Sequence, residues 1–231
     1  NILNQDAICE LYQNNGDGTF TNVASEVGLD VKAFVKGCTW GDINNDILPD
    51  LYLSVMGDKN LLFLNKGEQA DGTWNFEDIS ESAGVQAPIF SFPTWFWDFD
   101  NDGWQDIFVS GYDTEWERLP NDFCAELEGM PLENALPKLY KNYGDNTFSE
   151  VSEEMGIKKP LHSMGGNFGD IDNDGYLDFY VGTGNPDFRS VVPNRMFKNN
   201  VGGSKSFTDV TYISGTGHIQ KGHGIGFGDI D

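Results

Sequence analysis

The sequence has few cysteines, few basic residues and no long apolar stretch. Its three cysteines, Cys9, Cys38 and Cys124, are too few and odd in number for a disulfide scaffold, so at most one internal bridge can form. Cys9 and Cys38 are the candidates for that bridge, and three free thiols are the alternative. No run of 18 or more apolar residues occurs, so we expect no membrane-spanning helix in this chain.

Basic residues are outnumbered, with 14 Lys and Arg against 37 Asp and Glu, and the formal net charge is -23. A chain this acidic repels phosphates, which excludes nucleic-acid binding by charge neutralisation. High net charge can also indicate disorder, but 17 Phe, 8 Tyr and 6 Trp supply the core that disordered chains lack. The acidity therefore indicates that cations are among the partners of this protein.

Ten-residue helical patterns are absent between the apolar segments, which excludes alternating helix and strand. The exception is an insert at residues 113–138, where we expect a short helix around residues 122–129. Elsewhere, short aromatic and aliphatic runs are separated by turns rich in Gly, Asn and Asp, which indicates strands and hairpins.

One acidic motif recurs along the chain. It reads DINNDILPD at residues 42–50, DFDNDGWQD at 98–106 and DIDNDGYLD at 170–178, and it begins again as DID at 229–231. We number each of these Asp loops from its first residue and call the three complete ones loop 1, loop 2 and loop 3. A second motif alternates with them, as in LYQNNGDGTF from residue 11 and LYKNYGDNTF from residue 139.

Each repeat unit thus predicts four strands: one before the Asp loop, one after it, and a hairpin. Four strands in about 40–60 residues are typical of a β-propeller blade. We therefore expect an all-β fold, a β-propeller of four-stranded blades with an Asp loop between the first two strands of each. The single domain, 1–231, divides into the end of a blade (1–30), three blades (31–84, 85–156 with the insert 113–138, and 157–214) and the start of another (215–231). These are fewer than four blades, so we expect a piece of a larger propeller.

The Asp loops predict calcium sites. Oxygen-bearing side chains at positions 1, 3, 5 and 9 and the backbone carbonyl at position 7 form a hard-oxygen shell of the kind that Ca²⁺ prefers, and Gly at position 6 allows the sharp turn. Mg²⁺ fits less well because it demands stricter geometry, and Zn²⁺ is disfavoured because no Cys or His lies in any loop. An EF-hand is excluded because position 12 is not Glu but Leu53, Val109 or Val181.

We expect two to four Ca²⁺ ions in all. Loop 1 should be the weakest or a geometrically altered site, because it has Ile47 in place of Gly and Asn44 at position 3. The alternative, a solvated turn without metal, accounts poorly for three full copies. The expected ligands are Asp42, Asn44, Asp46, Leu48, Asp50, Asp98, Asp100, Asp102, Trp104, Asp106, Asp170, Asp172, Asp174, Tyr176, Asp178, Asp229 and Asp231.

The chain resembles the FG-GAP/VCBS repeat propellers, most closely the branch related to cartilage acidic protein. The Asp loops, Trp-Gly-Asp at residues 40–42, Phe-Gly-Asp at 168–170 and 227–229, and the hairpin NNGDGTF at 14–20 carry the resemblance. It implies a propeller, commonly seven-bladed, with Ca²⁺ in the loops as in the integrin α head. It also implies an extracellular, cell-surface or periplasmic location and a role in adhesion or assembly.

The predicted function is therefore a non-enzymatic, calcium-binding module for adhesion, protein–protein interaction or surface assembly. Its expected partner is a protein or carbohydrate at the cell surface, and the chain can be part of a larger assembly. The alternatives are a lectin-like module, with Trp104 and Tyr176 stacking on sugar rings, and an enzyme acting on polysaccharide. For the enzyme, the insert offers candidate residues that could line a sugar site: Asp113, Glu115, Glu117 and Arg118 beside Trp116.

Overall fold

A computed structural model describes most of the chain. The described residues are 7–113, 115, 118–132, 135–184, 187, 192–203 and 206–228. Asp229 and Asp231, two of the expected ligands, lie outside the described residues, as do Trp116 and Glu117 of the insert.

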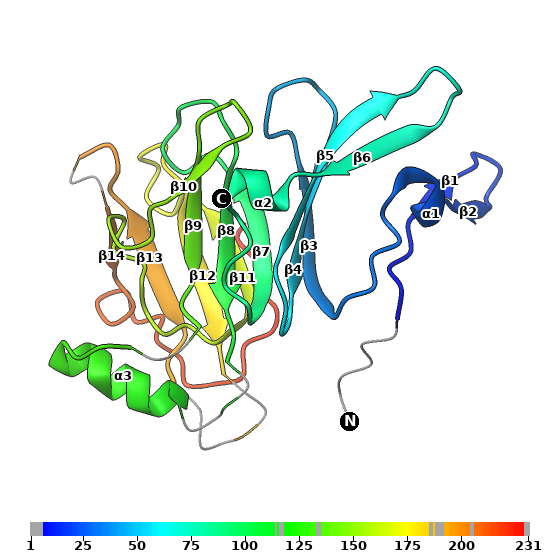
Figure 1. The fold of residues 1–231 in the computed structure, drawn as a ribbon. Helices are drawn as coiled ribbons and strands as arrows, with labels where there is room; N and C mark the ends of the chain where they lie inside the picture. The colour runs from blue at the N-terminus through cyan, green and yellow to red at the C-terminus, as the bar shows by residue number, and fades with distance from the viewer. Residues whose placement is uncertain are drawn as a thin grey trace.

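Three four-stranded antiparallel sheets and one hairpin make up the fold (Figure 1). In each sheet the strands pair in chain order, so every strand lies next to the one that precedes it. The first sheet contains β3 (Val35–Gly41), β4 (Asp50–Val55), β5 (Leu61–Glu68) and β6 (Trp74–Asp78). The second contains β7 (Ser91–Trp97), β8 (Asp106–Gly111), β9 (Lys138–Asn142) and β10 (Phe148–Glu150). The third contains β11 (Ser163–Gly169), β12 (Asp178–Thr183), β13 (Arg195–Asn199) and β14 (Phe207–Asp209). The hairpin pairs β1 (Tyr12–Asn14) with β2 (Phe20–Asn22).

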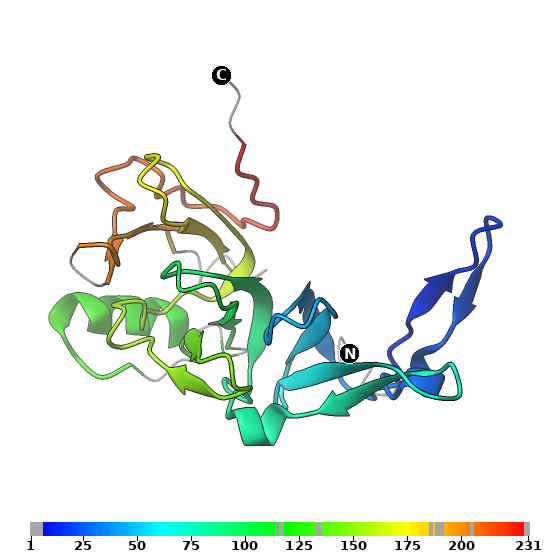
Figure 2. The ribbon, with the colours of Figure 1, turned by 90° about the horizontal axis from the view of Figure 1, so that it is seen from above.

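This topology confirms the predicted all-β fold of four-stranded antiparallel sheets, arranged as propeller blades are. Seen from above, the hairpin and the three sheets follow one another along an open arc (Figure 2). The described residues do not close into a ring. The number of blades in a complete propeller, and the exact division of the chain into blades, stay predictions.

Three helices lie between the strands in the described residues. α1 (Ala24–Val27) and α2 (Ser80–Ala83) are single turns that follow β2 and β6, and each ends at a glycine with positive φ. α3 (Arg118–Glu128) is the helix expected in the insert, but it starts earlier than predicted because Pro120 is tolerated in a first helical turn. No helix in the described ranges is long and apolar enough to cross a membrane.

The core lies between the faces of neighbouring sheets. Between the first and second sheets, Tyr52 packs edge-on against Phe96 with ring centroids 6.4 Å apart. Between the second and third sheets, Phe108 lies 5.2 Å from Phe179. The second sheet is therefore covered on both faces, and the second strands β4 and β8 are buried at every position rather than at alternate ones.

Close approach of the innermost strands explains glycines in them. A Cβ at Gly37 of β3 would lie 2.7 Å from the carbonyl oxygen of Phe92 in β7, and one at Gly165 of β11 would lie 2.0 Å from that of His223. Both distances are below what real Cβ atoms show, so these positions require glycine. Cys9, Cys38 and Cys124 are free thiols, and the bridge considered above is not formed.

Buried asparagines connect the second and third sheets to the Asp loop of the sheet before each. Nδ2 of Asn142, at the end of β9, donates to the carbonyl oxygen of Ile43 in loop 1 at 2.7 Å and to that of Gln105 at 2.9 Å. Nδ2 of Asn199, at the end of β13, donates in the same way to Phe99 of loop 2 at 2.7 Å. Both asparagines are fully buried, so these amides satisfy carbonyl groups that water cannot reach.

We expect Asn142→Ala to lower the free energy of unfolding by about 2–3 kcal/mol, because it leaves buried carbonyl oxygens without donors. Urea denaturation is the measurement. Asn200→Ala is the matched control, since Nδ2 of Asn200 contacts Lys198, Ser206 and Thr208 within its own sheet. Equal losses in the two variants would contradict a link between sheets.

Candidate metal centres

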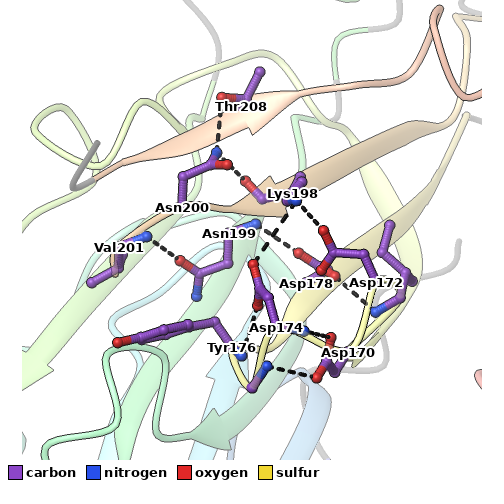
Figure 3. Close-up of polar contacts among 12 residues, drawn as sticks. Asp170, Asp172, Asp174, Tyr176, Asp178, Lys198, Asn199, Asn200, Val201 and Thr208 are labelled. Atoms are coloured by element: carbon purple, nitrogen blue, oxygen red, sulfur yellow. Dashed lines mark hydrogen bonds and ion pairs between the residues drawn. The ribbon is translucent and has the colours of Figure 1, made fainter. Parts of the chain in front are cut away.

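The three complete Asp loops lie at the same end of the sheets, each between the first two strands (Figure 1). The Asp at position 1 organises each loop by accepting two backbone N–H groups. In loop 2, the carboxylate of Asp98 accepts from Asp102 N at 3.0 Å and from Gly103 N at 2.9 Å. The same two bonds occur at Asp42 and at Asp170, the latter visible in Figure 3. These bonds fold the loop around its first carboxylate.

The Asp at position 9 is fully buried and joins the loop to the third strand. Asp106 accepts from Phe99 N at 3.2 Å and from Asn142 N at 2.8 Å. Asp50 and Asp178 do the same for loops 1 and 3, from the N–H groups of Ile43 and Asn65 and of Ile171 and Asn199. This carboxylate therefore fixes the register between loop and sheet before any metal is considered.

Burial has a strong electrostatic effect on these position-9 carboxyls. It raises the pKa of Asp106 to about 8 and that of Asp50 to about 6, and it raises the pKa of Asp178 as well. The two N–H donors act against burial in each case, and the other carboxylates of the loop act with it. A nearby cation would favour the ionised form and lower these pKa values.

The structure brings acidic groups together in loops 2 and 3. Ligand atoms of Asp98, Asp100 and Asp106 lie within 4.8 Å of one another, and so do those of Asp170, Asp172 and Asp174. Oδ1 of Asp100 is buried and has no hydrogen-bond partner. Carboxylate oxygens with a free buried acceptor suit a hard cation, so the residues fit Ca²⁺. The three clustered carboxylates of each loop would hold one ion, and the share of Asp102 and Asp178 stays a prediction.

Loop 1 departs from the other two in composition more than in backbone. The side chain of Asn44 donates to Oδ2 of Asp46 at 3.0 Å, and the loop retains the bonds made by Asp42 and Asp50. Ile47 takes a φ of +71°, close to the +89° of Gly103 and the +87° of Gly175. The expected change of loop geometry is therefore not seen in these bonds, and its weaker metal affinity stays a prediction.

The residue at position 7 forms a hydrogen bond within the loop through its backbone and packs against the sheet with its side chain. The N–H groups of Trp104 and Tyr176 donate to the position-5 carboxylates at 3.0 Å, and that of Leu48 at 2.8 Å. The rings of Trp104 and Tyr176 lie against Gly144 and Gly202, so closely that a Cβ on either glycine would clash. One face of each ring is thus occupied, which leaves less surface for sugar stacking. Carbonyl ligation at position 7 stays a prediction.

The acidic residues of the insert are not near the Asp loops. Arg118 pairs with Asp113 at 3.1 Å and with Glu115 at 3.0 Å. In Figure 1, α3, which begins at Arg118, lies at the end of the sheets opposite the loops. Both carboxylates are therefore already paired with one arginine, and a sugar site there stays a hypothesis.

Sequence reasoning missed two lysines in the metal centres. Nζ of Lys141 in β9 contacts Asp100 and lies 2.8 Å from Asp102. Nζ of Lys198 in β13 contacts Asp172 and lies 3.9 Å from Asp174 (Figure 3). Burial alone would lower the pKa of Lys141, but its bonds to the two carboxylates outweigh burial and raise it. The available signal was the Lys that precedes Asn in LYKN and MFKN.

Position 4 links neighbouring loops, which the sequence analysis also missed. Nδ2 of Asn45 donates to the carbonyl oxygen of Gly103 at 3.1 Å, and Nδ2 of Asn101 donates to that of Gly175 at 2.8 Å. Both asparagines have a φ of +58°, a conformation that Asn tolerates better than most residues. The three loops therefore form one hydrogen-bonded row across three sheets.

We expect Ile47→Gly to raise the free energy of unfolding by about 1 kcal/mol. A β-branched residue at positive φ is strained, and the relief of about 1–2 kcal/mol outweighs the entropic cost of glycine. Urea denaturation in EGTA measures the effect without metal. Gly103→Ala is the reciprocal variant: its Cβ would meet no atom within 4 Å, so any loss reports backbone strain alone. No change in both variants would contradict this account.

Fold and loops together define a repeat protein whose units are four-stranded sheets with an acidic loop between the first two strands. Residues 98–181, from the start of loop 2 into β12, match the family model of the FG-GAP-like repeat. These residues are therefore similar to an FG-GAP-like repeat, and the resemblance inferred from the motifs is confirmed.

Curated relatives of this chain are named cartilage acidic protein 1. The protein of Xenopus tropicalis is 26% identical over 176 residues, which cover 75% of this chain and 25% of the relative. That of Homo sapiens is 23% identical over 214 residues, which cover 92% of this chain and 29% of the relative. That of Mus musculus is 23% identical over 218 residues, which cover 92% of this chain and 30% of the relative. The chain thus spans between a quarter and about a third of the length of these relatives.

Proposed function

We propose that this chain is a calcium-stabilised β-propeller scaffold that binds another protein outside the cytoplasm and has no catalytic role. The observation that carries the proposal is the recurrence of one loop geometry. All three loops repeat the bonds of positions 1 and 9, and loops 2 and 3 bring three carboxylates within 4.8 Å. A plain surface turn needs neither a buried carboxylate nor clustered ones.

The physical role of calcium follows from charge repulsion. Loops 2 and 3 each hold four carboxylates within nine residues, which repel one another when ionised. A divalent cation offsets half of that formal charge and binds only the folded loop. Its binding energy therefore adds to folding stability. The bound ion would supply positive charge, and the protein supplies the folded carboxylates that would ligate it.

An extracellular setting suits this chemistry. Calcium there is millimolar, enough to fill even weak sites with dissociation constants of about 10⁻⁴–10⁻³ M. The relatives are named for cartilage, a tissue rich in extracellular matrix. Adhesion or matrix assembly, with a protein or carbohydrate ligand, is the role we infer. The protein ligand is favoured, because the rings of Trp104 and Tyr176 lie against glycines and Arg118 already pairs with Asp113 and Glu115 of the insert.

We expect Ca²⁺ to raise the melting temperature of the protein, Mg²⁺ to raise it less, and metal analysis to find two to four bound Ca²⁺ ions. At a free Ca²⁺ concentration about 100 times the dissociation constant, each site adds about 2.7 kcal/mol, or about 5–10 °C for a chain of this size. Thermal melts in Ca²⁺, Mg²⁺ and EGTA measure it.

Asp98→Asn and Asp170→Asn should each remove about one ion and part of the Ca²⁺-dependent rise. Asp145→Asn is the matched control, because Asp145 bonds Thr147 in a hairpin turn outside the Asp loops. The protein-binding scaffold would lose its main support if calcium neither bound nor changed the melting temperature, and the loops would then be turns only.

A further inference from the structure

The two lysines in the metal centres occur only where a loop carries a fourth carboxylate. Position 3 is Asp100 in loop 2 and Asp172 in loop 3, and the Nζ of Lys141 or Lys198 contacts that carboxylate directly. Loop 1 has Asn44 at position 3. The lysines therefore accompany the position-3 aspartate within this one chain.

Strand register shows what replaces the lysine at loop 1. Phe63 pairs with Leu51, Tyr140 with Ile107 and Phe197 with Phe179, each partner being the residue after a position-9 Asp. The next residues are then equivalent, and they are Leu64, Lys141 and Lys198. Leu64 is only 5% exposed and packs in the core between the first and second sheets, so loop 1 has no ammonium group from this place.

When every carboxylate is counted as ionised, as it would be with a cation bound, the formal charges match as a result. Loop 1 has three carboxylates and no lysine, which gives −3. Loops 2 and 3 each have four carboxylates and one lysine, which also gives −3. Where loop position 3 is Asp, the equivalent residue of the third strand is Lys, and where it is Asn, that residue is Leu. The strand residue thus compensates for the charge of the loop residue.

We propose that Lys141 and Lys198 are built-in counter-charges that hold loops 2 and 3 folded without metal. They also give these loops a lower calcium affinity than the same loops would have without the lysines. This rests on the calcium-binding function proposed above. The ammonium group bonds carboxylates of the same cluster that would ligate the ion, so cation and lysine repel each other across shared ligands. Oδ1 of Asp100 stays free of hydrogen bonds while its Oδ2 contacts Lys141, so a ligand atom remains open for the ion.

Calcium titration calorimetry on the whole chain tests the proposal, with Lys141→Met and Lys198→Met as variants that keep most of the apolar stem. Each should bind Ca²⁺ about tenfold more tightly at one site, as expected when a like charge a few ångströms from a divalent ion is removed. In EGTA, each should melt at a lower temperature than the wild type, because four carboxylates then lack their internal cation.

Lys138→Met is the matched control. Lys138 lies on the same strand, its side chain has the same 24% exposure as that of Lys141, and it pairs with Glu150 at 3.2 Å outside the loops. The double variant Asp100→Asn/Lys141→Met gives loop 2 the Asn of loop 1 at position 3 and, as at Leu64, an apolar residue in place of the lysine. It should bind Ca²⁺ within a few-fold of the wild type and melt in EGTA at a higher temperature than Lys141→Met alone.

The outcomes separate this inference from the proposed function. Calcium binding that is unchanged or weaker in Lys141→Met and Lys198→Met, relative to Lys138→Met, would overturn the counter-charge role and leave the calcium scaffold standing. No calcium binding by the wild type or any variant would overturn both.

Discussion

The buried carboxylate at position 9 is the constraint on which the rest of the structure depends. Each one receives an N–H from the start of its loop and an N–H from the third strand, so it fixes loop and sheet together. The asparagine that supplies the second N–H then reaches the preceding loop with its side chain. One unexposed carboxylate therefore orients both its own sheet and the contact with its neighbour. A buried charge is costly unless such bonds offset it.

That cost explains why the site is acidic yet ordered. Every oxygen of Asp106 that burial deprives of water has a backbone donor, and the pKa still rises to about 8. Backbone donors alone thus do not fully compensate for burial among like charges. Lys141 and a bound cation are two further ways to supply positive potential at the same place. The buried carboxylate of loop 2 and the lysine beside the loop therefore answer one electrostatic requirement.

Strands, sheet order and loop positions could be predicted from the sequence because their signals are local. Gly and Asn turns between short apolar runs mark strand ends, and the Asp spacing marks the repeat. The contacts that finish the site could not be predicted, since they depend on register. Lys141 and Asp100 are 41 residues apart, and Asn142 and Ile43 are 99 apart. The quoted motifs contained these residues, but only paired strands bring them to the loops. Ile47 shows the opposite error. Its presence in place of Gly predicted an altered loop, but Ile47 adopts a positive φ because the surrounding hydrogen bonds hold it there.

The hydrogen bonds between loops of neighbouring sheets also bear on how metal binding in one loop would affect the other loops. Apolar packing between sheets resists separation but tolerates small sliding, whereas a hydrogen bond between loops does not tolerate it. Loop 2 donates to loop 3 through Asn101 and accepts from loop 1 through Gly103. A cation that orders loop 2 therefore orders one donor and one acceptor that belong to its two neighbours. If the loops hold cations, this row of bonds would couple their sites, so that the sheets would gain stability as a set rather than one at a time.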